Sequence, residues 1–407
     1  MKSVIILGDG MSDEPLPEHG GRTPLMMATK PSIDRIAREG CVGLLATIPD
    51  GLGAGSDVAN LAVLGYDPTK LQNGRAVLEA ASMGVDLAPD DVALRLNLLS
   101  TSDGLIRDHS SGHITTEEAA LIVRDLDAAF GARKGPLPVS FQAGVSYRHL
   151  LVLHGAWADP ALDCAPPHDH VGEAVADLLP KATSPAAQAA ERRLREIIAA
   201  TRPLLANHPV NRARAAAGKT AADSVWPWSP GRRPRMETLQ ERFGVTAAVI
   251  SAVDLVMGLG VYAGMDLVRV PGATGLHDTN YEGKAQAALE ALADHDLVYV
   301  HVEATDEAGH ARDLDLKVKC IEYLDARLTR LILEGIETRG LQATVAVLPD
   351  HPTFVRTGKH GRDPVPFAVW RPGMTPDAAT AYDESQALAG SCGLLEGDAF
   401  IRLVLGL

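Results

Sequence analysis

Asp306 and His310 stand four positions apart in a short segment that follows an apolar run at residues 297–302. If a helix begins after that run, the spacing puts the carboxylate and the imidazole on one helix face, where both can bind the same metal ion. Taken alone, the pair could also form a surface ion pair or cap a helix. Residues of the same types elsewhere in the chain decide between these interpretations.

Asp350 and His351 follow a second β-rich run, and His360 stands a short loop later. Consecutive residues of an extended chain point in opposite directions, so Asp350 and His351 could supply two neighbouring metal ions from one turn. Asp9 follows a third such run, where a lone aspartate is more often a turn or cap residue. The recurrence of these residue types after separate strands favours a shared metal centre. A mixed carboxylate and imidazole set suits Mn²⁺, Zn²⁺ or Co²⁺, whereas carboxylates and waters alone would favour Mg²⁺.

Ser56 directly follows a glycine-rich segment, residues 50–55, and begins a pattern typical of a helix. The glycines allow a ligand to approach the backbone closely. The free N–H groups of a helix N-terminus favour phosphate and an ionised serine oxygen. A serine in this position is also a common helix cap. Beside a metal centre we favour the nucleophile, which predicts phosphoryl transfer through Ser56.

Two motifs that would indicate nucleotide binding fail. Gly51, Gly53 and Gly55 lack the G-x-G-x-x-G spacing of dinucleotide sites. Residues 218–220 resemble the end of a P-loop, but Ala213 occupies the position of its first glycine. We therefore expect no nucleotide cofactor.

Strands are expected at residues 4–7, 297–302 and 344–348, where β-rich runs end in acidic or glycine-containing segments. Apolar strands that alternate with helical patterns predict a mainly parallel sheet covered on both faces. Such sheets form their sites beyond the carboxyl ends of the strands. Helices are expected at residues 30–39, 57–64, 186–200 and 284–293, with another beginning near Thr115, where Thr115 and Glu118 fit a capping box.

The middle of the chain, residues 73–246, is rich in histidine, arginine and proline. We interpret it as an inserted second domain, with residues 1–72 and 247–407 forming the metal-binding α/β domain. The proline-rich run at 226–234 is expected to be an ordered loop or a domain connection. The apolar stretch at 247–265 contains Asp254 and several glycines, so we expect a buried helix and turn there and not a membrane span.

Charge and cysteine content limit the partners and the compartment. The 407 residues carry a formal net charge of −14, which argues against binding to nucleic acid or to an anionic membrane. Four cysteines without a C-x-x-C pair give no sign of a zinc ribbon or a disulfide framework. The first apolar run is too short for a signal peptide, so we expect a cytoplasmic protein. The sequence leaves open whether it forms a homo-oligomer.

Segments spread over nearly the whole chain resemble the archaeal-type 2,3-bisphosphoglycerate-independent phosphoglycerate mutases, members of the alkaline phosphatase superfamily. The matching segments are residues 8–11, 55–60, 79–84, 112–118, 144–149, 208–211, 278–284 and 363–367. The resemblance implies an alkaline-phosphatase-like α/β fold, with a mainly parallel sheet flanked by helices and an inserted α+β domain. It also implies two divalent metal ions, Mn²⁺ first among the candidates and Zn²⁺, Co²⁺ and Mg²⁺ as alternatives.

The resemblance assigns a role to each candidate residue. One metal ion would be bound by Asp306, His310 and His360, and the other by Asp9, Ser56, Asp350 and His351. The chain departs from the family pattern at two places: Thr305 stands where the family has proline, and the loop around Lys359, Gly361 and Arg362 is unusual. These departures leave the metal ligands in place but put the substrate preference in question.

The activity implied by the resemblance is the interconversion of 3-phosphoglycerate and 2-phosphoglycerate through a phosphoserine at Ser56. The alternative is a related phosphotransferase or phosphatase that acts on another small alcohol phosphate, because the inserted domain selects the substrate. Arginine and lysine bind phosphate and carboxylate, and histidine can orient a hydroxy acid or move a proton. The candidates for holding the phosphorylated hydroxy acid are His109, His113, Arg148, Arg232, Arg233 and Lys284, each of which could instead form a structural ion pair.

Overall fold

The computed structural model describes residues 2–71, 74–132 and 134–407, which form two compact units. The first unit contains residues 1–72 and 235–407, and the second contains residues 73–234. The expected first boundary, between residues 72 and 73, lies outside the described residues. The expected second boundary was after residue 246, but the contacts assign residues 235–246 to the first unit, where Leu239 is buried and Arg242 donates to the Gly65 carbonyl.

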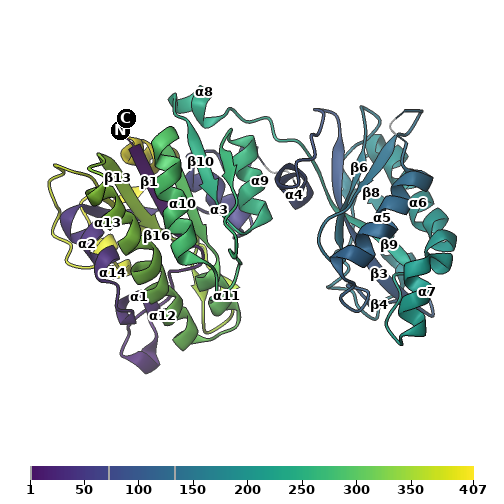
Figure 1. The fold of residues 1–407 in the computed structure, drawn as a ribbon, viewed down its shortest axis with the longest axis horizontal. Helices are drawn as coiled ribbons and strands as arrows, with labels where there is room; N and C mark the ends of the chain where they lie inside the picture. The colour runs from purple at the N-terminus through teal and green to yellow at the C-terminus, as the bar shows by residue number, and fades with distance from the viewer. Residues whose placement is uncertain (1, 72–73, 133) are drawn as a thin grey trace. The chain divides into compact units, whose positions relative to one another are not determined.

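The first unit is built on an eight-stranded sheet with the order β11-β10-β12-β1-β13-β16-β2-β17 (Figure 1). All neighbouring pairs are parallel except those made by β16, which runs opposite to β13 and β2. The mainly parallel sheet is therefore confirmed. The strands are β1 Lys2–Gly8, β2 Cys41–Leu45, β10 Ala247–Ile250, β11 Asp266–Val268, β12 Leu297–Val302, β13 Ala343–Leu348, β16 Val365–Trp370 and β17 Leu394–Leu395, with a separate hairpin of β14 Thr353–Phe354 and β15 Lys359–His360.

Helices cover both faces of this sheet, because every central strand is apolar on both sides. Side chains of α2, α10, α12 and α13 form one core with alternate residues of β1, β12 and β13, such as Val4 and Val345. On the opposite face, α15 packs on β1 and β13, and α9 packs on β10 and α3. The helices are α1 Pro24–Met27, α2 Pro31–Glu39, α3 Ser56–Val63, α8 Leu239–Phe243, α9 Asp254–Tyr262, α10 Tyr281–Asp294, α11 Ala304–His310, α12 Leu314–Tyr323, α13 Arg330–Thr338, α14 Glu384–Leu388 and α15 Ala399–Leu405, with short turns of helix at Pro17–His19, Pro68–Lys70 and Leu324–Thr329.

The second unit has a five-stranded antiparallel sheet in which the long strand β3 pairs with β4, β6 and β9. Helices α5 and α6 pack their apolar side chains on this sheet, through residues such as Ile122 and Leu194. The elements are β3 Val92–Ser102, β4 Leu105–Asp108, β5 Val139–Gln142, β6 Arg148–Leu153, β7 Leu162–Asp163, β8 Lys181–Ala182, β9 Ser224–Arg232, α4 Arg75–Ser82, α5 Thr116–Phe130, α6 Gln188–Asn207 and α7 Pro209–Ala216, with single turns at Val175–Asp177 and Pro185–Ala187.

Two predictions in this unit were wrong. The proline-rich run at 226–234 was expected to be an ordered loop or a domain connection, but most of it belongs to β9. Among the described residues this strand pairs with β3 alone, and an edge strand tolerates prolines. The helix expected to end before Pro203 continues to Asn207, because the turn beyond the proline buries Leu205 in the core. The capping box of Thr115 and Glu118 at the start of α5 is confirmed.

The apolar stretch at 247–265 contains strand β10 and helix α9, both in the first unit. Among the described residues, no helix is long and apolar enough to cross a membrane.

Candidate metal centre

The segments that follow three adjacent strands carry five of the predicted metal ligands, and Ser56 and His360 come from α3 and β15. Strand β1 lies between β12 and β13, and all three are parallel. Their ends therefore meet, and an acidic residue follows each strand: Asp9 and Glu303 come directly after β1 and β12, and Asp350 comes one residue after β13. Helix α11 begins directly after β12 and carries Asp306 and His310 one turn apart, as the spacing predicted.

Asp306, His310 and His360 form the first set of contacts. Nε2 of His310 lies 3.1 Å from Asp306 Oδ2, Nε2 of His360 lies 3.4 Å from Asp306 Oδ1, and the two imidazole nitrogens are 2.9 Å apart. Nδ1 of each histidine faces a main-chain carbonyl, that of Gly358 or Ala54, and so carries the proton. If each Nε2 lost its proton, both histidines could offer a lone pair to a metal ion beside Asp306.

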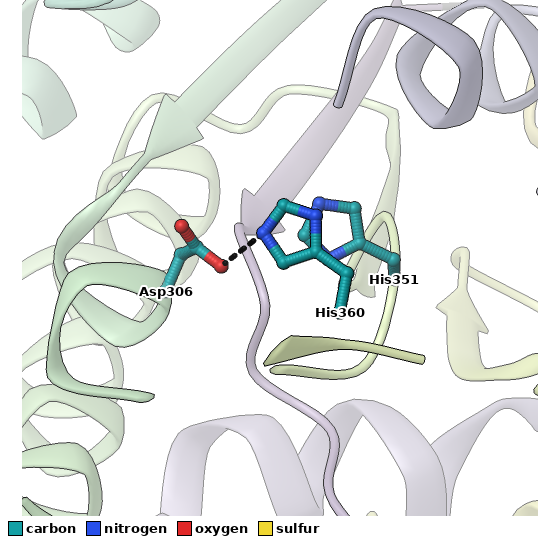
Figure 2. A group of neighbouring side chains, drawn as sticks. All are labelled: Asp306, His351 and His360. Atoms are coloured by element: carbon teal, nitrogen blue, oxygen red, sulfur yellow. Dashed lines mark ion pairs between the residues drawn. The ribbon is translucent and has the colours of Figure 1, made fainter. Parts of the chain in front are cut away.

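Asp9, Asp350, His351 and Ser56 form the second set. Nε2 of His351 lies 3.6 Å from Asp9 Oδ1, 3.5 Å from Asp350 Oδ2 and 3.1 Å from the Ser56 hydroxyl. The rings of His351 and His360 stack with centroids 3.9 Å apart, so the two sets adjoin (Figure 2). Figure 2 also shows His360 reaching towards Asp306, which can form a metal-binding group with His351 and His360.

Ser56 is the first residue of α3, and the cap position belongs to Gly55. Among the described residues, the hydroxyl of Ser56 contacts Nε2 of His351. The alternative role of Ser56 as a helix cap is therefore not supported. The helix N-terminus adds free N–H groups beside the hydroxyl, an arrangement that favours an anion.

The second set is suited to a cation because its negative charge is buried and uncompensated. Asp9 and Asp350 are fully buried, and Oδ1 of Asp9 has no hydrogen-bond partner among the described residues. Burial, with the nearby charges of Asp350, Glu303 and Asp306, raises the pKa of Asp9 well above its ordinary value. A divalent ion at this point would satisfy the orphaned oxygen and stabilise the ionised carboxylate.

In the first set, the negative charge of Asp306 is compensated by its histidine neighbours. Burial opposes ionisation of Asp306, but hydrogen bonds from His310, His360 and Thr353 outweigh burial and lower the pKa of its carboxyl group. The hydrogen bond to Asp306 raises the pKa of His310 to about 9. Without a metal ion, protons on these histidines supply the positive charge that a cation would otherwise supply.

A third group adjoins the second through Asp9, which also contacts His301, with Glu303 close by. Burial lowers the pKa of His301 to about 3 and raises the pKa of Glu303 to about 8. Lys284, a predicted substrate-binding residue, lies here; its buried ammonium group donates to the His301 carbonyl at 2.8 Å. Burial lowers the pKa of Lys284 to about 8.

Several residues that support the centre were missed by sequence reasoning. Asn60 donates from Nδ2 to Asp350 Oδ2 at 2.9 Å and to the Ser56 carbonyl at 2.8 Å, and it accepts from the Tyr299 hydroxyl. Thr353 donates to Asp306. The signal for Asn60 was its place one helical turn after Ser56, which puts both side chains on one face of α3.

Lys317 and Thr305 fix the loops that carry the ligands. The buried ammonium group of Lys317 donates to the carbonyls of Ser12 and Thr353 and to the carboxylate of Asp13, and so ties the loop after Asp9 to the loop after His351. Thr305 donates its hydroxyl to the Asp9 carbonyl.

The second unit contains a polar cleft of about 440 Å³. Asn97 connects two sides of the cleft. The Asn97 amide donates to the His109 carbonyl at 3.0 Å and accepts from the Trp228 indole at 2.9 Å. The guanidinium group of Arg148 is exposed beside the Tyr147 hydroxyl. The cleft is lined by Arg75, Arg95, Asn97, His109, Tyr147, Arg148, His168 and Trp228.

The predicted substrate-binding residues of this unit divide into two groups. His109 and Arg148 line the cleft. The other three, His113, Arg232 and Arg233, do not line the cleft. The exposed His113 has its ring 6.5 Å from that of Tyr147. Arg232 donates to the Ala158 carbonyl, and Arg233 lies 3.5 Å from Asp86. Arg75, Arg95 and His168 were missed, because their elements are far apart in the sequence.

Comparison with known proteins places the chain in a family. The model of the 2,3-bisphosphoglycerate-independent phosphoglycerate mutase family matches residues 37–211. A protein of that name from Methanosarcina barkeri is 47% identical, over 100% of this chain and 99% of its own length. A solved structure from Pyrococcus horikoshii is 29% identical, with a TM-score of 0.81 over 100% of this chain and 96% of its own. The cofactor-independent phosphoglycerate mutase from Thermoplasma acidophilum shares the fold, at 24% identity and a TM-score of 0.70 with both chains fully covered. With full-length relatives this similar, the chain belongs to the 2,3-bisphosphoglycerate-independent phosphoglycerate mutase family.

Proposed function

We propose that this protein interconverts 3-phosphoglycerate and 2-phosphoglycerate, with Ser56 carrying the phosphoryl group between the two hydroxyls of glycerate. The observation that carries the proposal is the position of the Ser56 hydroxyl, 3.1 Å from Nε2 of His351 and at the N-terminus of α3. A serine there lies beside buried carboxylates and imidazoles, and the cap position of the helix belongs to Gly55.

Two divalent metal ions complete the proposed site, with Mn²⁺ the first candidate. Asp306, His310 and His360 would hold one ion. Asp9, Asp350, His351 and the Ser56 oxygen would hold the other. Bound there, divalent ions would lower the pKa of the serine hydroxyl and neutralise charge on the phosphoryl oxygens.

The chain's own residues perform the transfer in two displacements. The Ser56 hydroxyl loses its proton and Oγ attacks phosphorus, so the Oγ–P bond forms while the ester P–O bond breaks and the glycerate oxygen takes up a proton. The free N–H groups at the start of α3 stabilise the phosphoryl oxygens. The other hydroxyl of glycerate then attacks the phosphoserine, loses its proton and regenerates the Ser56 hydroxyl.

The cleft of the second unit has the chemistry to hold an anionic hydroxy acid. Arg75 and Arg148 supply guanidinium groups that suit a carboxylate or a phosphate, Arg95 is paired with Glu79, and His109 and His168 can hydrogen-bond to hydroxyl groups. We infer that the cleft is a binding site for an anionic hydroxy acid of the substrate class.

The proposal is tested with the purified full-length protein and Mn²⁺. Phosphorus NMR would follow 3-phosphoglycerate and 2-phosphoglycerate while a colorimetric assay measures inorganic phosphate. Interconversion without stoichiometric phosphate release is expected. Release of phosphate without formation of the other isomer would show a phosphatase and would overturn the mutase assignment.

A further inference from the structure

Two cysteines that are far apart in the sequence meet at one edge of the first unit. The Sγ atoms of Cys41 and Cys392 lie 2.9 Å apart, although 351 positions separate the residues. Both are free thiols. Cys41 is the first residue of β2 and is 5% exposed, whereas Cys392 precedes β17 and is partly exposed.

The backbone on both sides fixes this approach. Strand β17 pairs in parallel with β2, and the Cys392 N–H donates to the Val42 carbonyl at 3.2 Å while the Leu44 N–H donates to the Gly393 carbonyl at 2.8 Å. Cys41 and Gly43 share one face of β2, since side chains alternate along a strand. A Cβ atom on Gly43 would lie 2.8 Å from Cβ of Cys392, so the glycine leaves the room that Cys392 occupies beside Cys41.

The surroundings leave the two thiols to react with each other. The described groups that could hold a metal ion contain no cysteine. The nearby carboxylate of Asp377 is engaged, because its Oδ2 accepts from the N–H groups of Val42 and Ser391. A thiol pair in sulfur contact without a third ligand has the chemistry of a dithiol.

We propose that Cys41 and Cys392 are a redox-sensitive pair that forms a reversible intrachain disulfide by exchange with a low-molecular-weight disulfide. The Cys392 thiolate attacks one sulfur of that disulfide, forms a mixed disulfide and releases one thiolate. Cys41 then loses its proton and attacks the Cys392 sulfur, which forms the Cys41–Cys392 bond and releases the second thiolate. The two cysteines are oxidised, the external disulfide is reduced to two thiols, and the two protons end on those thiols.

Exposure and acidity agree on this order of events. Cys392 is partly exposed and can meet the external disulfide, whereas buried Cys41 is placed to attack second. The hydrogen bond between the two sulfurs lowers the pKa of Cys392 and raises that of Cys41. A lower thiol pKa increases the fraction of reactive thiolate.

The disulfide would fasten the C-terminal part of the chain to the sheet. Strand β17 is a two-residue edge strand, and α15, which follows it, packs on β1 and β13. A cross-link between residues 351 positions apart removes much of the freedom of the unfolded chain, so it stabilises the folded state. The oxidised protein should therefore unfold at a higher temperature than the reduced protein.

The test equilibrates the full-length protein with mixtures of reduced and oxidised glutathione. Free thiols are then alkylated, and the digested protein is mapped by mass spectrometry, with thermal unfolding measured in parallel. Wild type and the control Cys164→Ser should each lose two thiols, yield a Cys41–Cys392 cross-linked peptide and gain about 5 °C or more in unfolding midpoint. Cys41→Ser should form no cross-link and should instead retain glutathione on Cys392.

Two results would overturn the proposal. One is that both thiols of wild type remain free in oxidised glutathione, or that Cys392 pairs elsewhere. The other is that Cys41→Ser carries no glutathione on Cys392 after the same treatment, which would show that Cys392 is not the attacking thiol. Both readouts are independent of mutase activity, so they stand whether or not the proposed function holds.

Discussion

The hydroxyl of Ser56 lies 3.1 Å from Nε2 of His351, although 295 positions separate the two residues. Two features of the fold create this contact. Strand β13 delivers His351 to the carboxyl edge of the parallel sheet, and α3 begins with Ser56. The serine is therefore placed by the same sheet edge that gathers Asp9, Asp306 and Asp350.

Replacement of Asn60 by Ala should weaken metal binding without unfolding the protein. The Asn60 amide holds Asp350 Oδ2 and the Ser56 carbonyl, and loss of a residue that orients a ligand typically lowers metal affinity by about 10-fold to 100-fold. Affinity for Mn²⁺ is measured by competition with a fluorescent chelator. As a matched control, Tyr299→Phe removes only the hydrogen bond to Asn60 and should have the smaller effect. Equal affinities for wild type and Asn60→Ala would contradict this role.

Removal of one ligand from each set should separate the two metal sites. Wild type that has been stripped with chelator and reloaded should bind two divalent ions per chain, measured by atomic emission after dialysis. His310→Ala and Asp9→Asn should each retain one, since each removes a donor from a different set. The exposed His19→Ala should retain both. The assignment of two metal sites would be contradicted if wild type bound a single ion, or if both ligand variants still bound two.

Arg148→Ala should impair substrate binding more than it impairs folding. Arg148 is exposed in the cleft and can bind an anion through its guanidinium group, so its loss should raise KM by about 10-fold or more. Arg107→Ala is the matched control, because this arginine is also exposed but pairs with Asp103 and does not line the cleft. Steady-state kinetics with 3-phosphoglycerate distinguish the variants, and an unchanged KM in Arg148→Ala would exclude the cleft arginine from substrate binding.

The stability of the protein should fall as the pH falls from about 6.5 to about 4, in part because of His149. Burial lowers the pKa of His149 from 6.5 to about 4, and its Nδ1 accepts from the Gly144 N–H. In this pH window His149 is protonated in the unfolded chain but stays neutral in the folded protein. The free energy of unfolding therefore decreases on acidification, by on the order of 3 kcal/mol in total from the value above pH 6.5. His149→Asn keeps an acceptor but does not titrate. Urea unfolding across this range should show a shallower pH dependence for the variant, and parallel curves would contradict the prediction.

The sequence pointed to Asp9, Asp306 and Asp350 as candidate ligands because each stands shortly after an apolar strand. Asp9, Asp306 and Asp350 stand where apolar runs stop, and parallel strands bring such positions together. The four-residue spacing of Asp306 and His310 also translated directly into one helix, α11. Local sequence patterns were therefore enough to predict residues that are positioned by a single strand or helix.

Two other features of the structure depend on pairing between segments that are distant in the sequence. The cleft joins α4, β3, β6 and β9, and β9 looked like a loop because prolines mark loops unless the strand lies at an edge. The contact between Cys41 and Cys392 depends on the pairing of β2 with β17, a strand of only two residues. No local periodicity reveals such a strand.

Trapping of the phosphoryl group on Ser56 tests the proposed mechanism most directly. The Mn²⁺-loaded protein would be mixed rapidly with 3-phosphoglycerate that carries radioactive phosphorus, quenched in acid at short times and mapped by peptide sequencing. Label on Ser56 that appears no later than labelled 2-phosphoglycerate is the predicted result, and Ser56→Ala should show neither label nor product. Formation of 2-phosphoglycerate by Ser56→Ala, or label on another residue of the wild type, would contradict a phosphoserine at this position.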